Sequence, residues 1–191
     1  ARRAAAVELA RRVNAELPPL GLREGAFDVE LETVEVGPGG GDRLAFTFAP
    51  NPGEPARTLA RIASGGEASR LSLALKVVLA AADETPLLVF DEVDAGIGGR
   101  HATALGERLR ALSAFHQVVC VTHLPQVAAH ADVHVHVGKA VVAGRTVADL
   151  RVLEGDERAA ELAAMLGGES AGREARAAAE ALLRAVRTGG S

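Results

Sequence analysis

The chain has 191 residues, of which 48% are apolar and 24% charged, and this composition predicts one soluble globular domain with a sizeable core. Its net charge of −4 gives no general attraction to nucleic acid, so any DNA contact would depend on local patches. The single cysteine, Cys120, excludes a disulfide framework within the chain, and no apolar stretch is long enough to span a membrane. We therefore expect a protein of the reduced cytoplasm without a membrane partner.

The first 50 residues predict a helix followed by an antiparallel hairpin. Apolar residues at helical spacing indicate a helix over 1–17, and the proline pair Pro18-Pro19 ends it. Alternating apolar residues over 27–36 and 44–48 flank a glycine-rich turn at 37–41. This pattern is typical of a β-hairpin with a long loop.

The rest of the chain alternates between helices and strands. Helices are expected over 66–82, about 100–114, 124–131, 156–166 and 170–186. Strands are expected over 87–90, 118–121 and 133–137, with a second hairpin over roughly 139–153. Because the strand–helix–strand order favours parallel pairing, we predict an α/β fold with a mainly parallel sheet flanked by helices, plus antiparallel hairpins.

Two adjacent acids, Asp91 and Glu92, end the apolar run 87–90. A run this short is typical of a strand buried on both faces, where a carboxylate is costly unless a cation or a hydrogen bond compensates it. A divalent cation and a phosphate would do so, and the pattern is that of the Walker B segment of nucleotide triphosphatases. Asp91 would then hold Mg²⁺ through water, and Glu92 would orient and deprotonate the attacking water. The alternative is a solvated strand end, which the apolar run disfavours.

A second motif, Ser64-Gly65-Gly66-Glu67, precedes the helix expected over 66–82. It is compatible with a simple capping box, in which Ser64 caps the helix and Glu67 reaches back. A capping box does not explain two glycines in a first helical turn, because each costs about 0.5–1 kcal/mol relative to alanine. Without Cβ atoms, the backbone amides are open to a ligand, and a helix start favours an anion. We therefore favour a phosphate site here.

A third segment, 118–121, is an apolar run followed by Thr122 and His123. The carboxyl ends of parallel strands meet at one sheet edge, which predicts that His123 and Glu92 face the same ligand. His123 would donate to a γ-phosphate, although a lone histidine is more often structural. Asp94 is compatible with a turn or a helix cap, and Arg100 with either the surface or a phosphate contact.

Three segments together resemble the ABC-type ATPase head shared by SMC-like proteins: 62–70, 90–99 and 121–128. The long forms of the second and third resemble the RecN family of bacterial DNA repair proteins in particular. The resemblance implies that 1–20 ends a coiled-coil helix and that 21–191 is the carboxy-terminal lobe of the head. It also implies that Ser64, Gly65, Gly66 and Glu67 form the signature motif, that Asp91 and Glu92 are the Walker B pair, that Asp94 is in the D-loop and that His123 is the switch histidine.

The same resemblance implies ATP and Mg²⁺ as cofactors and three kinds of partner. These are the amino-terminal Walker A lobe of the same head, a second head in an ATP-dependent dimer, and DNA. It further implies a cytoplasmic, nucleoid-associated protein that hydrolyses ATP in double-strand-break repair and recombination.

The sequence departs from the family pattern in lacking a Walker A motif, a Q-loop and the coiled coil. ATPase activity is therefore expected only with a Walker A lobe. Two alternatives stay open. One is a head lobe of another SMC-like repair ATPase, and the other is a non-hydrolysing binding module that keeps the shape of a head.

Overall fold

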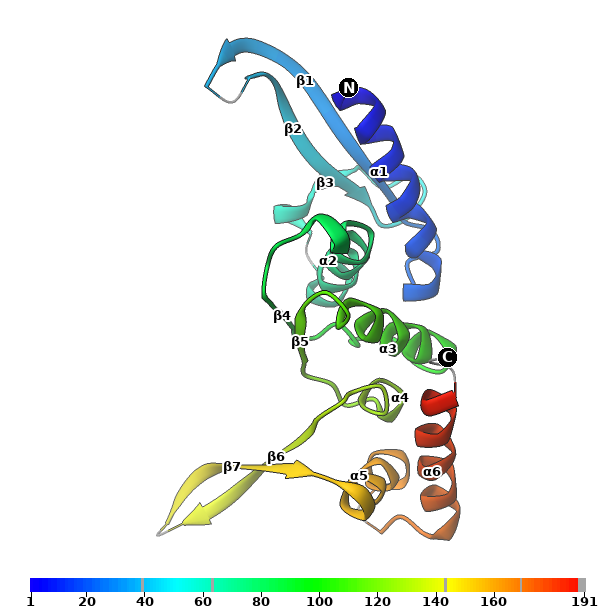
Figure 1. Ribbon diagram of the computed structural model, residues 1–191. Helices are drawn as coiled ribbons and strands as arrows, with labels where there is room; N and C mark the ends of the chain where they lie inside the picture. Colours follow the sequence, from blue (N-terminus) through cyan, green and yellow to red (C-terminus); the bar gives the residue numbers. More distant parts are fainter. Residues whose placement is uncertain (39, 63, 143, 169, 189–191) are drawn as a thin grey trace. The chain divides into compact units, whose positions relative to one another are not determined.

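The computed structural model describes residues 1–191 except 39, 63, 143, 169 and 189–191 (Figure 1). The chain divides into two units, Ala1–Val121 and Thr122–Ser191. Three of the expected segments contain a residue outside the described part: Gly39 in the first turn, Ala63 next to the glycine motif and Ala143 in the second hairpin. The proposed division into 1–20 and 21–191 stays a prediction.

The first unit opens with the expected helix and hairpin. Helix α1 (Arg2–Glu16) is followed by the short helix η1 (Pro18–Leu20), and β1 (Ala26–Gly37), β2 (Gly40–Ala49) and β3 (Arg57–Thr58) form an antiparallel sheet in that order. The Asn14 side chain ties α1 to β1, because its amide nitrogen donates to the Phe27 carbonyl at 2.8 Å and its oxygen accepts from the Phe27 N–H at 2.9 Å.

The expected long hairpin loop is wrong, since β1 continues to Gly37 and β2 resumes at Gly40. An irregularity in register between Thr33 and Gly37 lets the strands pair up to the turn. Phe27 and Phe48 face each other across the two strands, and both are buried.

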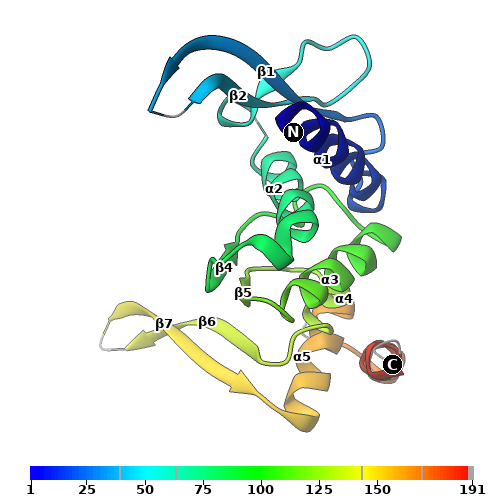
Figure 2. The ribbon, with the colours of Figure 1, turned by 45° about the horizontal axis from the view of Figure 1, so that its top comes forward.

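The second half of this unit contains the segments that matter for the site. After η2 (Leu59–Arg61) come α2 (Gly65–Leu79), η3 (Ala80–Ala82), β4 (Leu87–Phe90), α3 (Arg100–Leu112) and β5 (Gln117–Cys120). Strands β4 and β5 pair in parallel, and the ladder extends one residue further because the Val121 N–H donates to the Phe90 carbonyl at 3.0 Å. In both views α2 and α3 lie side by side, with β4 and β5 along one side of the pair (Figures 1 and 2).

Strand β4 is buried on one face only, which corrects the expectation of a strand buried on both. Leu88 and Phe90 are 7% and 6% exposed, whereas Leu87 and Val89 are 45% and 63% exposed. Val119 and Val121 continue the exposed face on the β5 side. The reason is that side chains alternate along a strand, and no described part of this unit covers the second face.

The second unit pairs a helical core with a hairpin. Helices α4 (Pro125–Ala128), α5 (Gly155–Gly167) and α6 (Arg173–Thr188) share a small core, and β6 (His134–Val142) pairs with β7 (Arg145–Leu153). The core centres on Leu162, which is fully buried. The strand expected over 133–137 as part of the parallel series falls in β6 and pairs antiparallel with β7, which corrects that expectation.

The predicted α/β fold class is confirmed: helices cover one face of a parallel strand pair, and antiparallel hairpins accompany it. Within the described residues the parallel part is limited to β4 and β5. Within the described residues, no helix is both long and apolar enough to cross a bilayer.

Candidate functional site

The glycine motif forms the start of α2, as the sequence predicts. Ser64 is the N-cap residue and has extended backbone angles, and its hydroxyl accepts the Glu67 N–H at 3.4 Å. The capping part of the capping-box interpretation is therefore confirmed. Capping leaves other amides of the first turn without a partner inside the helix, so it is compatible with an anion at the same place.

The two glycines have a reason inside the chain that sequence reasoning missed. A Cβ at Gly65 would lie 2.6 Å from a carboxylate oxygen of Glu92. A Cβ at Gly66 would lie 3.0 Å from the Ala95 Cβ and 3.1 Å from the Ala95 carbonyl oxygen. The loop that follows β4 therefore packs directly on the first turn of α2. A side chain at position 66 would meet the backbone of this loop, whereas one at position 65 would meet only the end of the Glu92 side chain.

That loop, residues 91–97, carries the predicted acids in a constrained conformation. Glu92 has a φ of 55°, the one left-handed non-glycine residue among those described. Such a backbone is unusual for a side chain of this size and persists when its surroundings fix it. The Glu92 N–H donates to an Asp91 carboxylate oxygen at 2.9 Å, and the Ala95 N–H donates to the Glu92 carbonyl at 3.0 Å.

The carboxylates of this loop differ in exposure. Asp91 and Glu92 are exposed, whereas Asp94 is 4% exposed. The pKa of the neighbouring Cys120 thiol is raised to about 12, first by burial and then by the charges of Asp94 and Asp91. Cys120 is therefore a protonated, unreactive thiol, and the charges of Asp94 and Asp91 act on it at the end of β5.

Two side chains of α2 hold this loop, and neither was singled out from the sequence. The Ser69 hydroxyl donates to the Asp91 carbonyl at 3.0 Å. The Arg70 guanidinium donates to the Ala95 carbonyl at 2.7 Å and to the Val93 carbonyl at 3.4 Å. The sequence offered one signal for Arg70. It lies four residues from both Gly66 and Ala74, so it shares their helix face, and both of these residues are buried.

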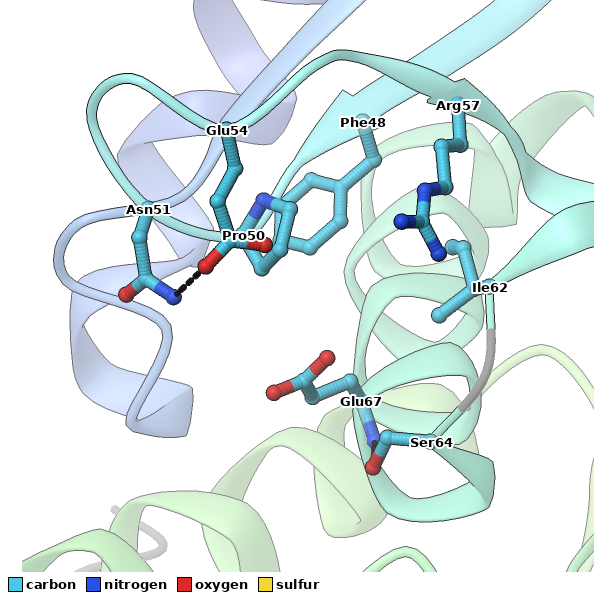
Figure 3. A pocket seen from close by; sticks show the side chains of 8 residues that line it. All are labelled: Phe48, Pro50, Asn51, Glu54, Arg57, Ile62, Ser64 and Glu67. Atoms are coloured by element: carbon cyan, nitrogen blue, oxygen red, sulfur yellow. Dashed lines mark hydrogen bonds between the residues drawn. The ribbon is translucent and has the colours of Figure 1, made fainter.

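A cavity of about 230 Å³ opens beside the start of α2 (Figure 3). Ser64 and Glu67 line it from α2, and Arg57 projects into it from β3. The wall opposite the helix comes from β2 and the loop after it, where the Asn51 amide donates to Glu54 at 2.7 Å. The predicted signature residues therefore border a hollow that contains charges of both signs.

His123 belongs to the second unit and is exposed three residues after the end of β5. The predicted approach of His123 to Glu92 crosses the boundary between the two units and stays a prediction. Strand β6 carries two histidines, His134 and His136, and within the described residues no group of three or more metal-ligating side chains gathers. One of them, His136, lies 3.1 Å from a carboxylate oxygen of Glu161.

Comparison with solved structures defines the class of fold. The chain superposes on the Smc head domain with a coiled coil and joint from Pyrococcus yayanosii with a TM-score of 0.59 and 22% identity, covering 84% of this chain and 29% of that one. It matches the Smc head domain from Pyrococcus furiosus with a TM-score of 0.55 and 23% identity, covering 80% and 35%. The chain thus has the fold of an SMC-type head domain.

Sequence relatives narrow this class. No family model matches the chain. It is 45% identical to the DNA repair protein RecN of Xylella fastidiosa over 94% of its length, and 46% identical to that of Streptomyces coelicolor over 98%. The chain is thus similar to RecN proteins over nearly its whole length. It spans about one third of the length of these curated relatives, namely 33% and 35%.

Proposed function

We propose that this chain is the signature- and Walker B-bearing lobe of the ATPase head of a RecN-type DNA repair protein. It would bind and hydrolyse ATP with Mg²⁺ only together with a Walker A lobe. The observation that supports this most strongly is the convergence of two motifs: the glycines that begin α2 lie directly against Glu92 and Ala95. The contacting residues are 27 and 29 positions apart in the sequence, so the fold brings the two motifs together.

In this proposal each acid has a separate task. Asp91 is an exposed carboxylate at the carboxyl end of β4, which is the oxygen-ligand chemistry that Mg²⁺ prefers. Bound there, Mg²⁺ would neutralise charge on the phosphates. Glu92 would accept a proton from the attacking water, and His123 would donate to the γ-phosphate. Asp94 would lie at the interface with the second head.

Ser64 and the amides of the first turn of α2 would contact the nucleotide that a second head holds. The Ser64 hydroxyl and the dipole of a helix of 15 residues both favour a phosphate. Glu67, which follows Gly66, lines the cavity beside the start of α2 together with Ser64. A pair of heads would therefore close over ATP, and hydrolysis would reopen them.

The exposed apolar face of β4 and β5 supports the partner assignment. Leu87, Val89, Val119 and Val121 lie on this face and are between 44% and 63% exposed. An apolar sheet face of this kind is typical of an interaction surface. The RecN relatives are about three times as long as this chain, so we assign the face to the Walker A lobe of the same polypeptide. DNA binding and a nucleoid location are proposed from the name of these relatives alone.

ATP-dependent dimerisation of the reconstituted head tests the signature assignment. Ser64→Arg is expected to abolish dimers in ATP, because its side chain would fill the space at the start of α2. Glu92→Gln is expected to retain or increase closed dimers, since only turnover should be lost. Ser72→Ala, an exposed position on the same helix, is the control. Light scattering measures the mass, and normal ATP-dependent dimers from Ser64→Arg would refute the assignment.

A further inference from the structure

Two side chains of α2 donate hydrogen bonds to the loop that carries Glu92 and Asp94, one before Glu92 in the sequence and one after it. Ser69 donates to the carbonyl immediately before Glu92, at Asp91, and Arg70 donates to the carbonyl immediately after it, at Val93. Arg70 also donates to the Ala95 carbonyl, so both neighbours of Asp94 are bound to one guanidinium. Glu92 and Asp94 therefore each lie between two backbone carbonyls that α2 binds.

Burial of Arg70 argues against a role in stability alone. Its side chain is 6% exposed, and its Nε is buried and has no hydrogen-bond partner among the described residues. Burial lowers the pKa of Arg70, and Glu67 opposes this only in part. A buried charge with an unsatisfied donor is costly, and a leucine or methionine would fill the same volume without that cost. What an arginine adds is a long side chain whose terminal Nη1 donates to two carbonyls at once.

The geometry of Gly66 ties the same guanidinium to the start of the helix. A Cβ at Gly66 would lie 3.0 Å from an Arg70 nitrogen as well as 3.0 Å from the Ala95 Cβ. The first turn of α2, the guanidinium and the loop are thus in mutual contact. A shift of the helix start would be passed to the loop, because the three groups leave no space between them.

We propose that Arg70, assisted by Ser69, is a positioning residue that fixes the loop 91–97 to the start of α2 and so couples the signature motif to Glu92. This inference rests on the proposed function for its catalytic meaning, but the coupling itself is a property of this chain. When a phosphate engages the amides at the start of α2, the guanidinium transmits that change to the backbone on either side of Glu92.

Amide hydrogen exchange in this chain, followed by NMR, tests the coupling without ATP. The Ala95 and Ile97 amides are the reporters, since they donate to the Glu92 and Asp94 carbonyls within the loop. Arg70→Lys keeps the charge, but its shorter side chain carries no nitrogen at the position of Nη1, and it is expected to speed exchange of both amides at least about tenfold. Hairpin amides of β1 and β2 should change less than about twofold. Ser72→Ala on the same helix is the control.

Two results would overturn the proposal: unchanged exchange at Ala95 and Ile97, or an equal increase at every amide, which would make Arg70 a core residue only. If Arg70→Lys does not fold, Ser69→Ala is measured instead. Faster exchange of the Glu92 amide is expected from this variant, and unchanged exchange would contradict the proposal. In the assembled head, Arg70→Lys should lower kcat about tenfold with KM for ATP changed less than about threefold. Absence of turnover in the unmodified head would refute the proposed function and leave the exchange result standing.

Discussion

The loop 91–97 and the β6–β7 hairpin differ in what holds them. The loop is fixed by side chains from the same unit, with Ser69 and Arg70 donating to three of its carbonyls. The hairpin has regular backbone pairing over nine residue pairs but little side-chain cover. On one of its faces Val135, Val137, Val141, Leu150 and Val152 are all 44% or more exposed.

This difference indicates which parts of the structure are complete within the chain. A two-stranded hairpin is marginally stable alone in water and gains stability by packing an apolar face against something else. In each view β6 and β7 extend away from α5 and α6 of their own unit (Figures 1 and 2). The loop is held by side chains of its own unit. The apolar faces of the hairpin and of β4–β5, in contrast, are exposed within the described part of the chain.

The largest difference in stability is expected between variants at two neighbouring residues of β4, one on its buried face and one on its exposed face. Leu88→Ala should lower the free energy of unfolding by about 2–4 kcal/mol, because Leu88 is buried. Val89→Ala should change it by less than about 0.5 kcal/mol, because Val89 is 63% exposed. Urea unfolding of the two variants measures both values. Equal losses would show that the second face of β4 is covered within this chain.

A smaller effect is expected from the two glycines. Gly66→Ala should destabilise the chain by about 1–2 kcal/mol, since the added Cβ meets the backbone carbonyl of Ala95 at 3.1 Å. Gly65→Ala should be nearly neutral, because it meets only the end of the flexible Glu92 side chain, which can move. The midpoint of urea unfolding distinguishes them. A greater loss for Gly65→Ala would contradict the described packing of the loop.

Much of the fold follows from local pattern. Helical spacing of apolar residues predicted α2 and α3, and the apolar runs predicted β4 and β5, because each element buries one continuous side. The limits of the first hairpin were wrong, because a change of register lets strands continue into a glycine-rich segment. The apolar run of β4 could not reveal its open face, since a run of this kind looks the same whether its cover lies in the same chain or elsewhere.

The places of the candidate residues in the fold were predictable, and their contacts were less so. The acids after β4 and the cap at Ser64 were visible because charge and glycine occur where an apolar pattern ends. The contact of Gly66 with Ala95 was not, since it joins segments 29 residues apart and depends on how the loop folds. Arg70 was overlooked because an arginine within a helix is usually solvated, and only its buried position distinguishes it.

The most direct test of the central claim is ATP turnover, with Mg²⁺, by this chain alone and mixed with the Walker A lobe that we propose as its partner. We expect turnover only in the mixture, and a loss of at least about 100-fold with Glu92→Gln but not with the exposed control Glu84→Gln. Turnover by the chain alone, or full turnover of the mixture with Glu92→Gln, would contradict the account. A folded mixture that never hydrolyses ATP would show a head-like binding module instead.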